Sequence, residues 1–185
     1  MQDLGPEKNS FYPPEILDQR KFNILLARQV AEAARNTTGL TLIMLTPDID
    51  TPSDDETRAD TEKALKSAMQ MAEGGNIGVV EPGKYGIILP KLDPAKSIAT
   101  IAVLLQTVST LLFKKGFSFT PAVGVAFYHH SDGSGQGSLY GRAFDALTHA
   151  QKEGGKIAVV LKPKQKISLD PLREDIQKSI TLIHK

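Results

Sequence analysis

Strand and helix signals follow one another in a fixed order between residues 40 and 128, and this order constrains the fold most strongly. Short apolar runs bounded by turn residues are typical of buried strands, and apolar residues at three- and four-residue steps are typical of helices. In chain order we expect a strand at 40–45, a helix at 55–73, strands at 77–80 and 85–89, a helix that begins at Asp93, and a strand at 118–128. Pro82-Gly83 joins the two middle strands as a tight turn.

The order strand-helix-strand-strand-helix-strand is that of the ferredoxin-like βαββαβ core. Because crossover connections are right-handed, the strand at 77–80 should lie parallel to the strand at 40–45, with 85–89 between them and antiparallel to both. The end of the first strand and the turn at Glu81-Pro82-Gly83-Lys84 should then lie side by side at one edge of the sheet. Loops at strand ends are where such folds place functional residues, so this edge is the candidate site.

Further elements flank this core and complete an α/β (α+β) chain. We expect a helix at 19–35 before it, and an added helix at 138–153 with a strand at 156–161 after it. Asp170-Pro171 has the form of a helix cap and predicts a C-terminal helix to about residue 183. Its apolar stripe, Leu172, Ile176, Ile180 and Ile183, should be buried on its own domain or on a partner. The expected division is an irregular lead-in at 1–14, one domain at 15–162, and a linker with a helix at 163–185.

Composition excludes several classes of protein. The 185 residues are 41% hydrophobic, which suits one compact domain. A net charge of +1 gives no sign of a nucleic-acid or acidic-lipid binder, and the absence of cysteine excludes disulfides and thiol catalysis. The start has no signal-peptide pattern, and the apolar stretch at 98–113 is interrupted by Thr, Ser and Gln. We therefore expect a soluble protein, or a soluble piece of a larger one.

Five segments together resemble the GGDEF domain, the diguanylate cyclase family of bacterial signalling proteins. Residues 17–22 resemble its L-x-N-R-x-x-F opening, 40–46 the strand that ends in a metal-binding Asp, 85–90 the F-x-x-x-L-P strand, 122–126 the S-x-G-x-A strand, and 143–154 the A-D-x-A-L-Y-x-A-K-x-x-G helix. The resemblance covers roughly residues 15–161. It implies the nucleotidyl cyclase type of fold and a cytoplasmic role in cyclic di-GMP signalling.

The resemblance also implies where the family's chemistry should be found. GGDEF domains join two GTP molecules into cyclic di-GMP, using two metal ions held by the Asp after the first strand and by an acidic residue of the hairpin turn. In this chain the first position is Thr46, and the signature G-G-D-E-F becomes Glu81-Pro82-Gly83-Lys84-Tyr85. A neutral hydroxyl and a cation thus stand where the family has carboxylates.

Lys84 opposes the binding of a divalent cation at this position. Like charges about 4 Å apart repel by several kcal/mol when they are partly buried. We expect Lys84 to pair with Asp48 or Asp50, and an alternative is that it extends into solvent. The acidic loop at 48–56 matches no calcium-loop spacing and is expected to be solvated. The degenerate site therefore comprises Thr46, Asp48, Asp50, Glu81, Pro82, Gly83 and Lys84, with no catalytic residue and no metal ligand expected.

These observations favour a catalytically inactive GGDEF-like domain that serves as a regulatory or protein-interaction module in bacterial signal transduction. No cofactor is expected, and a protein partner or self-association is. The alternative is a nucleotide-binding sensor, or a cyclase-like enzyme with altered ligands, which would use magnesium and GTP. Neither hypothesis involves nucleic acid or insertion of this segment into a membrane.

Overall fold

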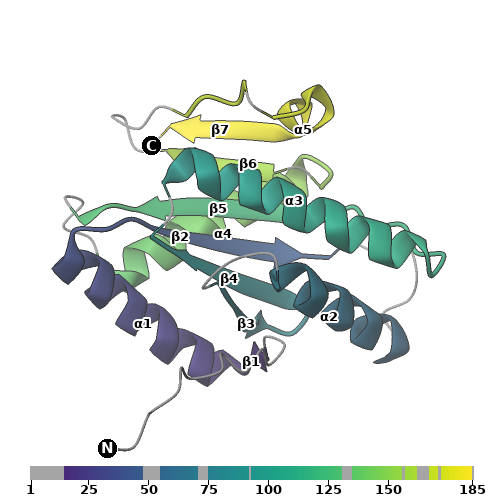
Figure 1. Ribbon diagram of the computed structural model, residues 1–185, viewed down its shortest axis with the longest axis horizontal. Helices are drawn as coiled ribbons and strands as arrows, with labels where there is room; N and C mark the ends of the chain where they lie inside the picture. The colour runs from purple at the N-terminus through teal and green to yellow at the C-terminus, as the bar shows by residue number, and fades with distance from the viewer. Residues whose placement is uncertain are drawn as a thin grey trace, which may run out of the picture.

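The computed structural model describes residues 15–47, 55–70, 75–91, 93–130, 135–155, 157–161, 167–170 and 172–184. Its elements are β1 (Ile16–Leu17), α1 (Gln19–Asn36), β2 (Leu40–Thr46), α2 (Asp55–Met69), β3 (Asn76–Glu81), β4 (Lys84–Pro90), α3 (Pro94–Phe113), β5 (Ala122–Tyr128), α4 (Gln136–Lys152), β6 (Ile157–Leu161), α5 (Glu174–Lys178) and β7 (Ile180–His184). The strands form one sheet in the order β1-β3-β4-β2-β5-β6-β7. In Figure 1, α2 and α3 lie in front of this sheet and α4 lies behind it.

The predicted ferredoxin-like core is confirmed. β4 pairs antiparallel with both β2 and β3, so β3 runs parallel to β2 with β4 between them. β5 pairs antiparallel with the other side of β2. The added unit of α4 and β6 is also as predicted, because β6 extends the sheet parallel to β5. The short strand β1 was not expected, and it pairs with β3 at the far edge.

Each face of the sheet buries its own hydrophobic core. The front core gathers apolar side chains of α2 and α3 on residues such as Ile43, Ile87 and Val125. The rear core gathers those of α1 and α4 on Leu42 and Ile88, among others. Neighbouring strand residues belong to opposite cores, as the alternation of side chains along a strand requires.

Glycines in the strands allow the two rear helices to approach the sheet closely. A Cβ at Gly124 would lie 2.2 Å from the backbone nitrogen of Leu147 in α4. Gly78 and Gly86 are paired across β3 and β4, and Phe22 of α1 lies against both. The Phe22 ring is fully buried in this slot. The resemblance to the family's opening motif thus falls on a residue that anchors α1 to the hairpin.

The predicted C-terminal helix is wrong. The helix that forms, α5, covers only Glu174–Lys178, and the chain then continues as β7, parallel to β6. Residues 180–184 read ITLIH, in which β-branched side chains favour a strand, and β6 offers an unpaired edge for it to occupy. Ile180 and Leu182 pack on the front core and Ile183 on the rear core. Three residues of the expected apolar stripe, Leu172, Ile180 and Ile183, are therefore partly buried against the chain's own two cores, and β7 is a strand of the same sheet.

Candidate functional site

The tip of the hairpin between β3 and β4 is a two-residue turn at Pro82-Gly83. Gly83 has φ of 73°, which a type II turn requires at the position after its proline. The pairing of the strands shifts between Val79 and Glu81, which marks a bulge at the end of β3. Because of this shift, Glu81 lies opposite Lys84 and on the same side of the hairpin. The bulge is held by α1, since Gln19 Nε2 donates a hydrogen bond to the carbonyl oxygen of Val80 at 2.7 Å.

Lys84 forms an ion pair within the turn itself. Its Nζ lies 2.7 Å from Glu81 Oε2 and 5.0 Å from the centre of the Phe144 ring on α4. Only 26% of the Lys84 side chain is exposed, so it does not extend into solvent. The partners that we predicted, Asp48 and Asp50, lie outside the described residues. The observed partner, Glu81, was expected at the site but not in this role.

Aromatic side chains of α4 cover this ion pair. Tyr140 and Phe144 are one helical turn apart, and their rings stack with centres 6.5 Å apart and planes inclined by 10°. Burial and the charge of Glu81 raise the pKa of Tyr140, while Lys84 opposes that shift. The i, i+4 spacing of two aromatic residues is visible in the sequence. Sequence reasoning nevertheless missed them, because nothing in the chain showed that α4 passes beside the turn.

Tyr85 fixes the other side of the hairpin end. It faces the front core and is 3% exposed, and its hydroxyl donates to Glu62 Oε1 of α2 at 3.2 Å. Burial, followed by the charge of Glu62, raises the pKa of Tyr85, and Arg58 acts in the opposite direction. The turn is therefore held from α4 on one face and from α2 on the other.

Thr46 ends β2 at the same edge of the sheet. Leu45 pairs with Tyr85 and Thr46 pairs with Ala122, which places Thr46 beside the turn as the predicted topology required. Gln151 Nε2 of α4 lies 3.4 Å from Thr46 Oγ1. Among the described residues, the hydrogen-bond partner of the Thr46 hydroxyl is thus a neutral amide.

The described residues at this edge do not fit the two divalent ions that the cyclase resemblance implies. Divalent magnesium prefers carboxylate oxygens. Within the part of the chain that the structure describes, no group of three or more His, Cys, Asp and Glu side chains is positioned to hold a metal ion. The carboxylate within the hairpin end itself, that of Glu81, is paired with the ammonium group of Lys84. No reaction step through a metal ion can be assigned to these residues.

Several solved structures with a similar fold contain GGDEF domains. Diguanylate cyclase SiaD from Pseudomonas aeruginosa, solved with its activator SiaC, has a TM-score of 0.67 and 21% identity, and the match covers 77% of this chain and 58% of SiaD. The GGDEF domain of DgcB from Caulobacter crescentus, solved with c-di-GMP, has a TM-score of 0.64 and 18% identity over 85% of this chain and 98% of that domain. The FimX GGDEF domain from Pseudomonas aeruginosa matches with a TM-score of 0.60 and 14% identity, over 80% of this chain and 99% of that one.

No protein-family model and no curated protein sequence matches the chain. At 14–21% identity these similarities establish the fold of the chain. The chain has the fold of a GGDEF domain, with Glu81 and Lys84 paired at the tip of the hairpin between β3 and β4.

Proposed function

We propose that the chain is a GGDEF-fold domain that does not synthesise cyclic di-GMP and acts as a regulatory or protein-interaction module in bacterial, cytoplasmic cyclic di-GMP signalling. The observation that carries the proposal is the ion pair of Lys84 with Glu81 at the tip of the signature hairpin, at 2.7 Å. It is supported by Thr46, a neutral residue at the end of β2.

The electrostatics of the turn support the loss of catalysis. A metal ion at the turn would need a free carboxylate, and binding one to Glu81 would first break its contact with Lys84. The released ammonium group would then face the incoming cation at close range, which is unfavourable in a partly buried site. The ring of Phe144 beside Lys84 further stabilises the ammonium group of Lys84 in its observed position.

The intact scaffold supports a role in interaction. The slot for Phe22, the bulge and the turn are all formed, so the domain presents the shape of a cyclase domain without its charged ligands. A fold that is kept while the site changes is consistent with selection for binding. SiaD, with the same fold, was solved in complex with a protein activator, which makes a protein partner for this chain a reasonable expectation.

Turnover and binding can be measured separately on the purified chain. The protein is incubated with GTP and MgCl₂, and cyclic di-GMP is quantified by chromatography, with an active GGDEF protein assayed in parallel. We expect no product. Melting temperatures are recorded with and without GTP or cyclic di-GMP, since a ligand that binds the folded state raises them. A shift without turnover supports the alternative function, a nucleotide sensor.

The variant Lys84→Ala is the matched control. It removes the cation and leaves the turn residues Pro82 and Gly83 in place. If the wild-type chain makes cyclic di-GMP and Lys84→Ala does not, Lys84 takes part in a reaction and the proposal of an inactive site is wrong. If neither makes product, the missing metal ligands account for the inactivity, because removing the opposing charge does not restore them.

A further inference from the structure

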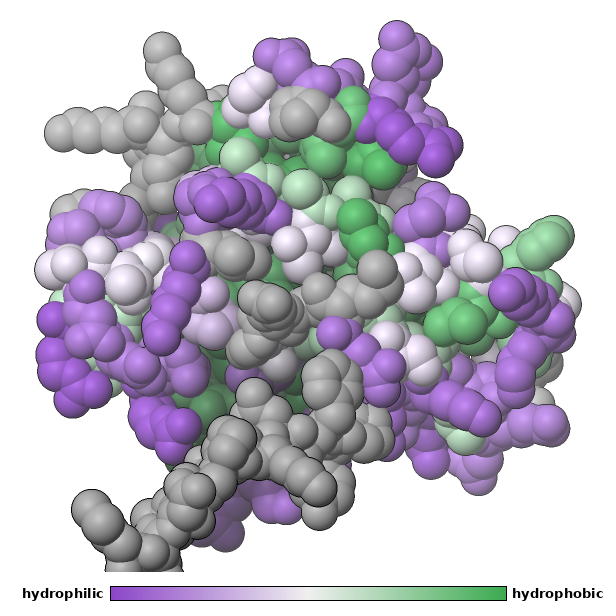
Figure 2. Space-filling view, in the orientation of Figure 1, coloured by the Kyte–Doolittle hydropathy of each residue, from purple (hydrophilic) through white to green (hydrophobic). Residues whose placement is uncertain are grey.

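The outward face of α3 has an unusual composition for an exposed helix. Over its 20 residues the helix carries a single charged side chain, Lys96. It is long and apolar enough to span a membrane by length and composition, and only 39% of that apolar window is buried. Val103 and Phe113, on its outer side, are 48% and 79% exposed. In Figure 2, white and green residues gather over α3 on this side of the molecule. Exposed apolar surface of this kind commonly marks an interaction site.

The spacing of the exposed residues is that of a helix–helix contact. The half-buried Ala99 and the exposed Val103, Gln106, Thr110 and Phe113 follow one another at steps of four, three, four and three residues. Such steps align side chains in one seam, as at the a and d positions of a heptad. The core-facing residues of α3, including Ile98, Ile101 and Val108, lie on the opposite side and are buried against the sheet. The helix therefore has two seams, and among the described residues no element packs on the outer one.

We propose that the outer seam of α3 pairs with the same seam of a second copy of the chain, with the two helices antiparallel. The seam is self-complementary about Gln106. In an antiparallel pair centred there, the small Ala99 faces the bulky Phe113 of the other copy, and Val103 lies within one residue's rise, about 1.5 Å along the axis, of Thr110. The two Gln106 carboxamides meet on the twofold axis, where each can donate to the other.

Charge at the ends of the helix agrees with this pairing. Antiparallel packing sets the N-terminal end of each α3 beside the C-terminal end of the other, which is the favourable arrangement of helix dipoles. It also brings the exposed Lys114 toward Asp93 of the other copy, about 7 Å apart along the axis by the helical rise. The ammonium group of Lys96 lies 3.7 Å from the Asp93 carboxylate of its own chain. Because its charge is compensated there, Lys96 does not repel the second copy.

The size of the seam predicts a reversible dimer. From Ala99 to Phe113 the helix is about 21 Å long, so the contact buries less than the roughly 800 Å² per partner typical of stable complexes.

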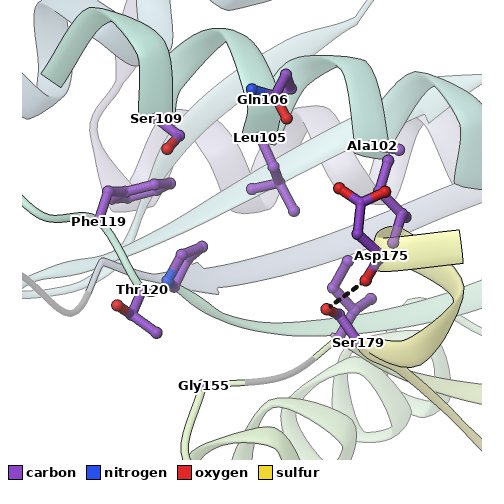
Figure 3. Close-up of a pocket in the computed structure, with 12 residues that line it drawn as sticks. Ala102, Leu105, Gln106, Ser109, Phe119, Thr120, Gly155, Asp175 and Ser179 are labelled. Atoms are coloured by element: carbon purple, nitrogen blue, oxygen red, sulfur yellow. Dashed lines mark hydrogen bonds between the residues drawn. The ribbon is translucent and has the colours of Figure 1, made fainter. Parts of the chain in front are cut away.

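A pocket of about 320 Å³ borders the seam, between α3 and the segments that carry Phe119 and α5. Figure 3 shows Gln106 and Ser109 on one wall and Thr120, Asp175 and Ser179 on the other. Side chains of the second copy can extend the contact there. The inference does not depend on the loss of catalysis proposed above.

Sedimentation equilibrium on the purified chain tests the proposal. Between about 5 and 500 μM we expect the mass to rise from monomer to dimer. Val103→Glu and Phe113→Glu place a carboxylate in the seam and should weaken the dimer at least about tenfold, since burying an unpaired charge is costly. Ile24→Glu is the matched control, because Ile24 is 61% exposed but lies on α1, behind the sheet, and should leave the dimer unchanged. All three side chains are exposed, so the variants should fold, as their melting curves would show.

Cysteine crosslinking tests the antiparallel register, and the chain has no cysteine of its own. Gln106→Cys should form a disulfide-linked dimer on oxidation. Lys96→Cys, on the same helix, should not, because the two copies of residue 96 lie about 30 Å apart in the proposed pair. Three results would overturn the proposal: a monomer over the whole range, a dimer that neither Val103→Glu nor Phe113→Glu weakens, or crosslinking of Lys96→Cys as fast as Gln106→Cys. If the chain stays monomeric and sediments together with lipid vesicles, the seam would instead be assigned to binding of a membrane surface.

Discussion

Two levels of the same hairpin hold their shape in different ways. In the middle of β3 and β4, the paired Gly78 and Gly86 lie against the buried ring of Phe22. At the tip, Glu81 and Lys84 meet through an ion pair that is partly open to solvent. In the middle of the hairpin an added Cβ at Gly78 or Gly86 would clash with the Phe22 ring. At the tip, water can take the place of the ion pair between Glu81 and Lys84. The hairpin is therefore positioned from its buried part, and its tip is free to change its chemistry while keeping its place.

Removing the ring that fills the glycine slot should have the largest effect. Phe22→Ala leaves a cavity between α1 and the hairpin, and such truncations of buried Phe cost about 3–5 kcal/mol. Denaturant unfolding of the variant and the wild type measures the difference. Ile24→Ala, two residues along α1 and exposed, is the control and should cost less than about 0.5 kcal/mol. Equal effects of the two variants would mean that the hairpin does not depend on the Phe22 contact.

Filling the slot from the strand side should have a smaller but clear effect. A Cβ at Gly86 would lie 2.4 Å from Phe22 Cζ, and because the ring is fully buried it cannot move aside freely. Overpacking of this kind costs about 1–3 kcal/mol. Denaturant unfolding should also show that Phe22→Leu, made together with Gly86→Ala, loses less than the sum of the two changes. Strict additivity of the two substitutions would contradict the proposed contact.

Tyr85 lies between the two levels, and its effect should depend on pH. Burial and the nearby Glu62 raise the pKa of Tyr85 above that of an unfolded tyrosine. The folded state thus keeps a proton that the unfolded state loses near pH 10. Its contribution to stability is complete below about pH 10 and is lost as pH rises through the folded pKa.

Unfolding free energies measured between about pH 8 and 11 should fall less steeply for Tyr85→Phe than for the wild type. Glu62→Gln should keep most of the wild-type slope, since burial of the phenol, the larger cause of the raised pKa, remains after the charge is removed. An unchanged slope in Tyr85→Phe would show that Tyr85 does not carry the pH dependence.

The sequence alone was sufficient for the part of the fold that is set by local signals. Apolar runs, caps and the Pro82-Gly83 turn gave the order from β2 to β5, and the handedness of crossovers then gave their arrangement. The last segment was misjudged because Leu172, Ile176, Ile180 and Ile183 fit a helical stripe. Its final residues fit a strand equally well, and the free edge of β6 favoured the strand.

At the candidate site, sequence reasoning found the position of the turn but not its contacts. Thr46 and Lys84 were placed at one edge of the sheet through the order of the strands. The pairing of Lys84 with Glu81 depends on a bulge, and bulges leave no reliable pattern in a single sequence. The contact with Phe144 depends on how α4 crosses the sheet, which Gly124 allows by its close approach to the backbone of α4. These are long-range packing facts that residue spacing does not carry.

The ion pair at the tip should have the smallest effect on stability. The Glu81 and Lys84 side chains are 41% and 26% exposed, and pairs of this kind contribute about 0.5–1 kcal/mol. A double-mutant cycle with Glu81→Gln and Lys84→Met, read from denaturant unfolding, isolates their coupling. The coupling should shrink in about 1 M salt, where the Debye length falls to about 3 Å. A coupling above about 2 kcal/mol that persists in salt would break the comparison drawn between the two levels, because the tip would then be part of the framework that holds the hairpin in place.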